Sequence, residues 1–413
     1  MADGRGLTLT ARVRWRLLPW WGRVLLVYGA SRVVTTVLML AFASVQGRAN
    51  GVAAPDYPTF ATNWDGEWYR WIAAAGYPSD LPVDDAGHVT QNAWAFMPVY
   101  PGILAVFMRV GIPFEWMGVL VSLAAGAAAS LVFYLLMREN GFAASAALFS
   151  VVLLVTGPLS PLFQVNYAES LGLALLLVAL LLVIRRRLLL AIPVIAVMSL
   201  TRPSGLAFAC FLLLYLVWRI VRARRGRVTD PLTGREFASI VAAGLASFVA
   251  GLAWPVIAWW STGSPSAYFD TELAWRTGYV GYGHLVPFEG WAEGIGFWLR
   301  FVGVPEPISG PLGVASVIVA VVLAAAFLLS PWARRLGVEL RLWMASYVIY
   351  LLAVFFPQSS TWRLLLPLVP GLGALAVPRS RAFRIVLVVL GVLLQAWWIY
   401  ACWVRAPGDW SPP

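Results

Sequence analysis

The stretch FMPVYPGILAVFMRVG, residues 96–111, decides how the rest of the chain is threaded. It is apolar enough to enter a lipid bilayer, but Pro98 and Pro101 stand at its start, and its apolar run is shorter than the roughly 20 residues of a spanning helix. If this stretch crosses a bilayer, every later loop changes sides. If it lies at the surface, every later loop keeps its side.

Composition makes this a membrane protein. Of the 413 residues, 61% are hydrophobic and 12% are charged, and the mean hydropathy is +0.78. Apolar runs of spanning length recur from end to end, without a polar linker between folding units. The sequence predicts one all-α polytopic domain over residues 1–413 with about eleven spanning helices. These are expected at residues 22–45, 115–137, 143–162, 168–184, 188–201, 204–221, 237–260, 311–332, 339–356, 362–378 and 382–404.

Arginine carries all the positive charge of the chain. The 30 basic residues are all Arg, no Lys occurs, and the formal net charge is +11. Without lysine, a Walker-type phosphate loop and Schiff-base catalysis are excluded. Because the arginines cluster in short loops between apolar runs, they are expected to meet membrane lipids and set topology; nucleic acid is not an expected partner.

Cysteine and histidine are too few for several kinds of site. Cys210 and Cys402 lie inside apolar runs and imply no disulfide framework. His88 and His284 are too few for a His/Cys zinc site. A metal held by scattered carboxylates is conceivable, but arginine can meet phosphate charge instead. We therefore predict neither a metal nor another cofactor.

The arginine clusters orient the predicted helices. The basic N-terminus, with Arg5, Arg12, Arg14 and Arg16, is expected in the cytoplasm, because positively charged loops stay inside. If residues 96–111 form an interfacial helix, alternation keeps every later arginine cluster on that same side; if they span, four clusters move outside. These clusters lie at residues 185–187, 222–227, 334–335 and 379–384.

The same alternation places the two longest loops together on the extracytoplasmic side of the cell membrane. They cover residues 46–114 and 261–310, and both are rich in acidic residues. A protein with short cytoplasmic turns and elaborate external loops is expected to carry its active site on the external side.

Residues 62–78, TNWDGEWYRWIAAAGYP, crowd acids and tryptophans into the first of these loops. Thr62 or Asn63 is expected to cap a short helix that Gly76 and Pro78 end. Three tryptophans share one face of that helix, at the interfacial depth that indole rings favour. They are Trp64, Trp68 and Trp71.

Asp65 is the candidate catalytic base of this helix. It lies off the tryptophan face in the first turn, where the helix dipole favours an ionised carboxylate that can accept a proton. The alternative is that Asp65 only caps an interfacial helix, because first-turn acids are common for structural reasons. Arg32, inside the first span, is expected to be a structural partner of an internal carboxylate or carbonyl group.

The motifs of this loop resemble the first external loop of the phosphatidylinositol-glycan class V type mannosyltransferases. In that family a Trp-Asp pair precedes a short helix ending Gly-Tyr, followed by Gln-x-x-x-Ala-Phe-x-Pro-x-x-Pro. The matching positions here are Trp64, Asp65, Gly76, Tyr77, Gln91, Ala95, Phe96, Pro98 and Pro101. The resemblance continues at NYAESL, residues 166–171, and at SLTRPSGL, residues 199–206, where Pro203 and Ser204 replace a Ser-Asn pair. Beyond about residue 230 only the helix pattern is similar.

This resemblance implies the GT-C fold and an inverting membrane mannosyltransferase. Such an enzyme moves a hexose, here mannose, from polyprenyl phosphate mannose to a hydroxyl of a lipid-linked or cell-envelope glycan outside the cytoplasm. It also implies that Asp65 activates that hydroxyl. Because a lipid phosphate is already a good leaving group, one carboxylate suffices where a glycosidase needs two.

Arginines are the expected partners of the leaving phosphate, since they offer planar bidentate donors. The candidates are Arg363, in an outward turn otherwise free of charge, and Arg202; for each, the alternative is a structural arginine at a helix end. Glu169, beside Tyr167, is expected either to hold acceptor hydroxyls or to pair with an arginine. Trp64, Tyr167, Gln91 and His284 complete the predicted binding set. His284 belongs to residues 274–288, which are either a lid or an ordinary surface loop.

Two other classes of function stay open. A lipid or glycolipid transporter would use the same bundle without making bonds, and it predicts a polar pathway through the middle of the membrane. A non-catalytic subunit of an envelope complex is the third interpretation.

Overall fold

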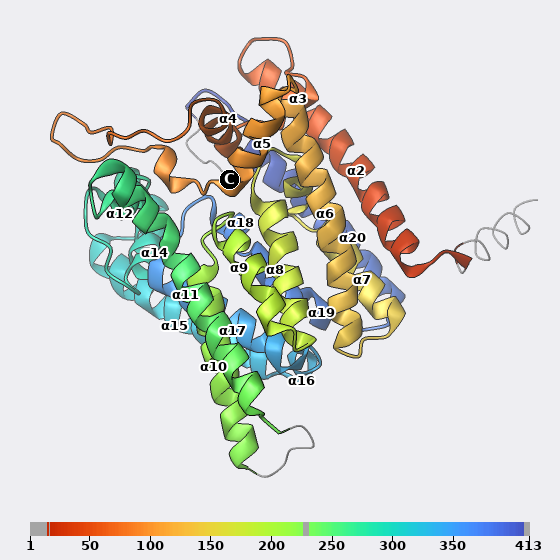
Figure 1. Cartoon of the computed structure of the whole chain (residues 1–413). Coiled ribbons are helices and arrows are strands. Elements are labelled where there is room, and N and C mark those ends of the chain that lie inside the picture. The colour runs from red at the N-terminus through yellow and green to blue at the C-terminus, as the bar shows by residue number, and fades with distance from the viewer. Residues whose placement is uncertain (1–14, 16, 226–230, 409–413) are drawn as a thin grey trace, which may run out of the picture.

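The computed structural model describes residue 15 and residues 17–225 and 231–408. In this part of the chain every regular element is a helix (Figure 1), and the only β contact is one bridge between Val83 and Val89. The all-α prediction is therefore confirmed for the described residues. The predicted cytoplasmic residues Arg5, Arg12, Arg14, Arg16 and Arg227 lie outside them.

Seven helices of the described residues are long and apolar enough to cross a membrane. Each corresponds to a predicted span, as expected of a multi-pass membrane protein. They are α2 (Trp20–Ala49), α6 (Phe114–Glu139), α10 (Gly205–Arg224), α11 (Gly234–Thr262), α15 (Glu306–Leu329), α17 (Gly337–Val354) and α20 (Arg381–Trp398), which continues into the π-helix η4 (Ile399–Trp403).

The other four predicted spans are short or broken helices. Three are α7 (Ala144–Thr156), α8 (Glu169–Ile184) and α9 (Leu188–Ser199), all shorter than the roughly 20 residues that cross a bilayer unaided. The fourth breaks into α18 (Thr361–Leu364), η3 (Leu366–Gly371) and α19 (Leu372–Leu375). Pro367 and Pro370 have no N–H for an α-helical ladder, which explains the break. The count of eleven spans stays a prediction.

Short helices of the first long loop lie over one end of the bundle (Figure 1). They are α3 (Tyr57–Phe60), α4 (Asp65–Ala75), η1 (Ala93–Ala95) and α5 (Val99–Arg109). Helix α5 has 11 residues, and at 1.5 Å per residue it is about 16 Å long, roughly half of a hydrocarbon core. Its length fits the predicted interfacial helix better than a span.

The two long loops contact each other. The second contains α12 (Ala267–Ala274), α13 (Thr277–Val280) and α14 (Gly290–Phe301). The Asn92 amide donates to the Thr271 hydroxyl at 2.9 Å, and the Tyr282 hydroxyl donates to the Asp84 carboxylate at 2.6 Å. Both loops therefore lie at one end of the bundle, in agreement with the predicted alternation. Which side of the membrane this end faces stays a prediction.

Arginines gather at the opposite end. Arg185, after α8, pairs with Glu139 at the end of α6 (2.6 Å). The buried Arg219, near the end of α10, pairs with Glu236 in the first turn of α11 at 2.6 Å. A further short helix, α16 (Pro331–Arg334), precedes α17. The Arg185–Glu139 and Arg219–Glu236 pairs therefore join helix ends far from the two long loops.

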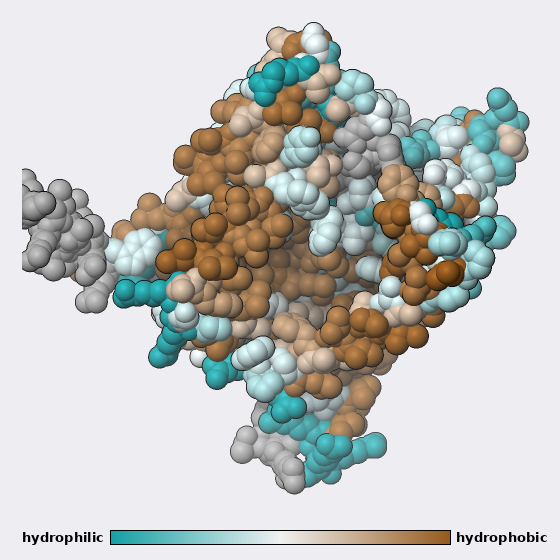
Figure 2. Space-filling view, turned by 180° about the vertical axis from the view of Figure 1, so that it is seen from behind, coloured by the Kyte–Doolittle hydropathy of each residue, from teal (hydrophilic) through white to brown (hydrophobic). Residues whose placement is uncertain are grey.

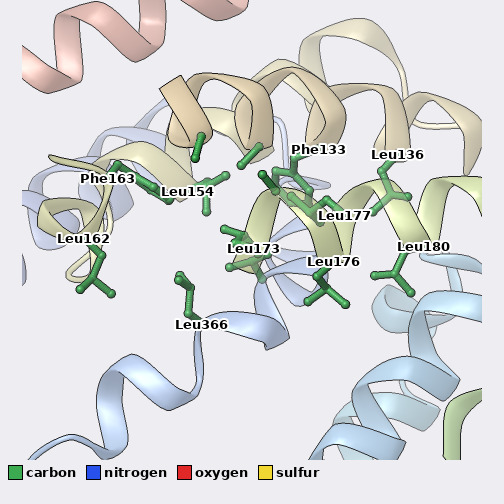
Figure 3. Packing of buried hydrophobic residues seen from close by; sticks show 14 of the residues in the cluster. Phe133, Leu136, Leu154, Leu162, Phe163, Leu173, Leu176, Leu177, Leu180 and Leu366 are labelled. Carbon is green, nitrogen blue, oxygen red and sulfur yellow. The ribbon is translucent and has the colours of Figure 1, made fainter. Parts of the chain in front are cut away.

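Helix α8 lies at the centre of the packed core and carries its N-terminus toward the loop end. Figure 3 shows Leu173, Leu177 and Leu180 of α8 among apolar side chains of α6 and α7, and all three are buried. The outer surface is apolar as well. Seen from behind, a broad brown band crosses the molecule with polar residues toward its edges (Figure 2), as lipid-facing helices require.

Candidate functional site

A cavity of about 660 Å³ lies between the helix bundle and the two long loops. Part of its wall is ionic, with side chains from both loops and from four helix ends. The charged residues are Asp65, Glu67, Glu169, Arg202, Glu272, Arg276, Arg363 and Arg405. Another part is aliphatic, and includes Leu173, Leu176, Leu206, Leu252, Leu351, Leu364 and Leu366.

A strained turn at Trp64 aims Asp65 inward. Trp64 has φ = 60°, which is uncommon for a residue with a side chain, and it is the N-cap of α4, so Asp65 is the first residue of the helix. Such a conformation costs about 1–3 kcal/mol and persists only where its surroundings hold it. Here the Trp64 indole donates to the Trp403 carbonyl at 3.1 Å, and the Arg405 guanidinium lies 4.7 Å from its ring centre.

The prediction that Thr62 or Asn63 caps this helix is wrong. The Thr62 hydroxyl donates to the Pro58 carbonyl, and the Asn63 amide donates to the Trp403 carbonyl and to Gln46. Both side chains therefore tie the approach to α4 to its surroundings instead of accepting from the helix. The predicted helix end at Gly76 is confirmed.

Helix α4 buries the face that carries Asp65 rather than its tryptophan face. Asp65, Tyr69 and Ile72 are buried at i, i+4 and i+7. Trp68 turns toward the protein, where its ring stacks on Phe96 at 5.7 Å, whereas Trp71 is 47% exposed. The three tryptophans therefore do not form the single membrane-anchoring stripe that their spacing predicts.

Four ionic side chains meet at the cavity, two from buried acids and two from partly buried arginines. The Arg363 guanidinium pairs with the Asp65 carboxylate and lies 3.4 Å from Oε1 of Glu169. On the other side of Glu169, Nη2 of Arg202 lies 3.5 Å from the same oxygen. The cluster holds two acids and two arginines, so its formal charges cancel, and Glu169 takes up the ion-pairing role that was one of its two predicted alternatives.

The backbone around the cluster fixes each member. Glu169 begins α8, Arg202 lies in the turn between α9 and α10, and Arg363 is in the single turn α18. Gly172 makes room for Arg202, because a Cβ there would lie 2.9 Å from Cγ of that arginine. The chain end also contributes, since Arg405 pairs with Glu67 at 2.7 Å.

Tyr167 supports the cluster from behind. Its hydroxyl accepts a hydrogen bond from the Asp65 backbone N–H at 3.1 Å, and the Arg363 guanidinium lies 5.3 Å from its ring centre. The side chain is fully buried and does not line the cavity. Tyr167 therefore positions Asp65 and Arg363 and leaves the cavity surface to them.

Burial changes the acidity of Asp65. Removal from water raises the pKa of this carboxyl, and the Arg363 charge opposes that rise. The sequence offered only the helix dipole as a reason for ionisation of Asp65; the structure adds the neighbouring charge of Arg363. A carboxylate kept in a cavity with a raised pKa is a stronger base than an exposed aspartate.

Two predicted binding residues lie apart from the cluster. Gln91 is exposed and lines the cavity wall, whereas His284 is exposed and does not line it. Arg32 does not line the cavity. Its guanidinium donates to the Ser160 carbonyl at 2.7 Å and to the Val155 carbonyl at 3.2 Å, which confirms the carbonyl alternative for this residue.

The cavity also includes charged residues that the sequence did not single out. Glu272 was one acid among several in the second long loop, and no motif marks it. Arg276 lies in the segment considered as a lid or surface loop, and this segment forms part of the wall. Arg405 follows the last helix, and nothing in its local sequence distinguishes it from a topology-setting arginine.

The described residues include no group of three or more His, Cys, Asp or Glu side chains placed to hold a metal ion. What the site offers is a buried base, guanidinium donors for an anion, and an aliphatic wall in the same cavity. Neither a protein-family model nor a curated protein matches this sequence.

Proposed function

We propose that this protein is an inverting membrane glycosyltransferase of the GT-C class. It would transfer a hexose, mannose by the resemblance of its first long loop, from a polyprenyl phosphate donor to a hydroxyl of a lipid-linked or cell-envelope glycan on the extracytoplasmic side. One observation carries the proposal: Asp65 and Glu169 meet Arg363 and Arg202 on the wall of a cavity that also has an aliphatic part.

The arginines supply the binding site for the donor phosphate. Guanidinium groups bind phosphate oxygens through parallel N–H donors. Among the described residues, the buried Nε of Arg363 has no hydrogen-bond partner, so this side chain has a donor to spare beyond its contacts with the two carboxylates. In the reaction, Arg363 and Arg202 stabilise the negative charge that grows on the phosphate as it leaves.

Asp65 acts as the base. It takes the proton of the acceptor hydroxyl while that oxygen attacks the anomeric carbon of the sugar. The new C–O bond forms on the face opposite the phosphate, and the bond to the phosphate oxygen breaks with its electron pair, which inverts the configuration. Polyprenyl phosphate leaves as the second product, and Asp65 later returns its proton to water.

The aliphatic wall suits the hydrocarbon of such a donor. Leu173 and Leu176 of α8, Leu206 of α10 and Leu252 of α11 line the same cavity as the ionic cluster. Burial of each CH₂ group stabilises a bound lipid by about 0.8 kcal/mol. A ligand with an anionic head and an apolar tail fits this division better than a free sugar nucleotide, which has no apolar tail.

Asp65→Asn tests the assignment of the base. The purified enzyme is given polyprenyl phosphate mannose with labelled mannose and a membrane lipid extract as acceptor, and transfer is measured. We expect a loss of at least about 100-fold, because general base catalysis contributes roughly 10² to 10⁴. Asp80→Asn, on an exposed acid of the same loop, is the matched control and should keep full transfer. Unchanged turnover in Asp65→Asn would exclude this residue as the base.

The same assay separates the transporter interpretation from the enzyme. A lipid transporter would move polyprenyl phosphate mannose between leaflets of a vesicle without consuming it. An enzyme converts it to polyprenyl phosphate and a mannosylated product. Loss of donor that depends on Asp65 supports the enzyme; movement of intact donor without loss supports the transporter.

A further inference from the structure

One of the carboxylates that line the cavity belongs to the second long loop. Glu272 lies on α12 and lines the cavity together with Tyr268, one helical turn earlier. Glu169 is held by two arginines, whereas no ion pair holds Glu272 among the described residues. Its oxygens are therefore available to a ligand.

The surroundings hold Glu272 in place. Thr271, the preceding residue, accepts a hydrogen bond from Asn92 at 2.9 Å, which ties α12 to the first long loop. Arg276, one turn later, donates to the Val354 carbonyl at the end of α17. A side chain on a helix that is tied down on both sides of it, at Thr271 and at Arg276, can present a ligand with a constant geometry.

The Trp275 indole lines the same cavity as the Glu272 carboxylate. Trp275 follows three residues after Glu272 and lines the cavity, with its ring against Trp68 at 5.9 Å and Phe96 at 6.0 Å. Its Nε1 is buried and has no hydrogen-bond partner among the described residues. Buried N–H groups are nearly always paired in folded proteins, so this donor has the capacity to pair with a ligand atom.

The charge of Asp65 influences the acidity of Glu272. Burial raises the pKa of Glu272, the charges of Arg276 and Arg202 oppose that rise, and the charge of Asp65 adds to it. Arg202 thus lies within electrostatic range of both Glu169 and Glu272. Arg202 pairs with Glu169 and lines the same cavity as Glu272, so a group bound next to Arg202 lies in the cavity that both acids line.

We propose that Glu272 and Trp275 form the hexose subsite of the donor. This inference rests on the proposed function, in which Arg202 and Arg363 bind the donor phosphate. Because the sugar is bonded directly to that phosphate, its ring must lie beside Arg202. Sugar hydroxyls donate to a carboxylate and accept from an N–H, and the C–H face of the ring packs on aromatic rings. Glu272 and Trp275 supply these groups.

The test measures how much the sugar adds to binding. The full-length protein in detergent is titrated with a short polyprenyl phosphate, with and without mannose, and the two dissociation constants are compared. We expect the mannosylated lipid to bind roughly 10-fold to 100-fold more tightly, the range given by one or two hydrogen bonds to a charged group. Glu272→Gln should reduce this ratio to below about 3-fold and leave binding of the sugar-free lipid phosphate unchanged.

Asp270→Asn is the matched control. It lies on the same helix, receives the same chemical change, and accepts a hydrogen bond from Ser266 outside the cavity. Its ratio of dissociation constants should match the wild-type ratio. Trp275→Phe is the second variant, since it keeps an aromatic ring and removes only the N–H. It should lower the ratio by a smaller factor even if Glu272→Gln does not fold.

Three results would overturn the inference, and they are distinguishable. If the wild-type protein binds neither lipid, the phosphate site and the proposed function fail together with the hexose subsite. If it binds both lipids equally, the phosphate site stands and the hexose subsite is wrong. If the preference for the mannosylated lipid survives in both variants, the sugar lies elsewhere in the cavity.

Discussion

Two arginines of this protein, the buried Arg32 and the partly buried Arg363, have different roles. Arg32, in α2, donates from all three guanidinium nitrogens to hydroxyl, amide and carbonyl oxygens of α2, α7 and η2. Arg363, in α18, meets two carboxylates at the edge of a cavity and keeps one buried nitrogen without a partner among the described residues. A fully satisfied guanidinium fixes packing, whereas one with a spare donor beside a cavity is available to a ligand.

Arg363→Gln has the largest expected effect and tests whether Arg363, unlike Arg32, acts in the function of the site. The change removes the phosphate donors and leaves Asp65 and Glu169 as adjacent buried acids, so mannose transfer should fall by at least about 100-fold. Labelled mannose transfer measures this directly. Arg109→Gln, an exposed arginine at the end of α5, is the control.

Arg363→Lys sharpens the result, because it keeps the charge and loses the planar bidentate donors. It should recover much of the thermal stability that Arg363→Gln loses, but little of the transfer activity. If Arg363→Gln instead retains near wild-type transfer per folded molecule, the residue is structural in the same sense as Arg32.

Arg32→Gln should show the reverse pattern. Several buried oxygens lose their donor, and each such loss costs about 1–3 kcal/mol, so the unfolding temperature in detergent should fall clearly. Binding of the short polyprenyl phosphate to the protein that remains folded should stay within about 3-fold of wild type. Arg48→Gln, an exposed arginine in the last turn of the same helix, should change neither quantity. Weak lipid binding by folded Arg32→Gln would show that Arg32 contributes to the lipid-phosphate site and not only to packing.

Gly172→Ala should give the smallest effect. The added methyl group would meet Cγ of Arg202 at 2.9 Å and displace that side chain from Glu169. Because a small misplacement weakens a positioned contact, the KM for the donor should rise by roughly 3-fold to 10-fold, with a smaller change in kcat. Gly102→Ala, in α5, is the control, since nothing lies within 4 Å of its added carbon. An unchanged KM in Gly172→Ala would argue against a donor-binding role for Arg202.

The differences between sequence and structure have local causes. Hydropathy marked residues 362–378 as a span, but Pro367 and Pro370 divide that segment into short helices. The spacing of tryptophans predicted the lipid-facing side of α4, yet the protein buries the neighbouring face that carries Asp65, whose partner Arg363 comes from a distant segment. Propensity and periodicity do not include such partners.

The sequence by itself determined a membrane bundle of helices, the acid-rich loops, and Asp65, Glu169, Arg202 and Arg363 as individual candidates. Transfer free energies of apolar runs and local helix signals depend on neighbouring residues, so they can be read along the chain. Only the tertiary structure decided that Arg363 meets Asp65 across 298 positions of sequence, that Trp403 and Arg405 hold the turn before it, and that Glu272 faces the same cavity. Such contacts depend on the packing of whole helices, which brings together segments that local patterns treat separately.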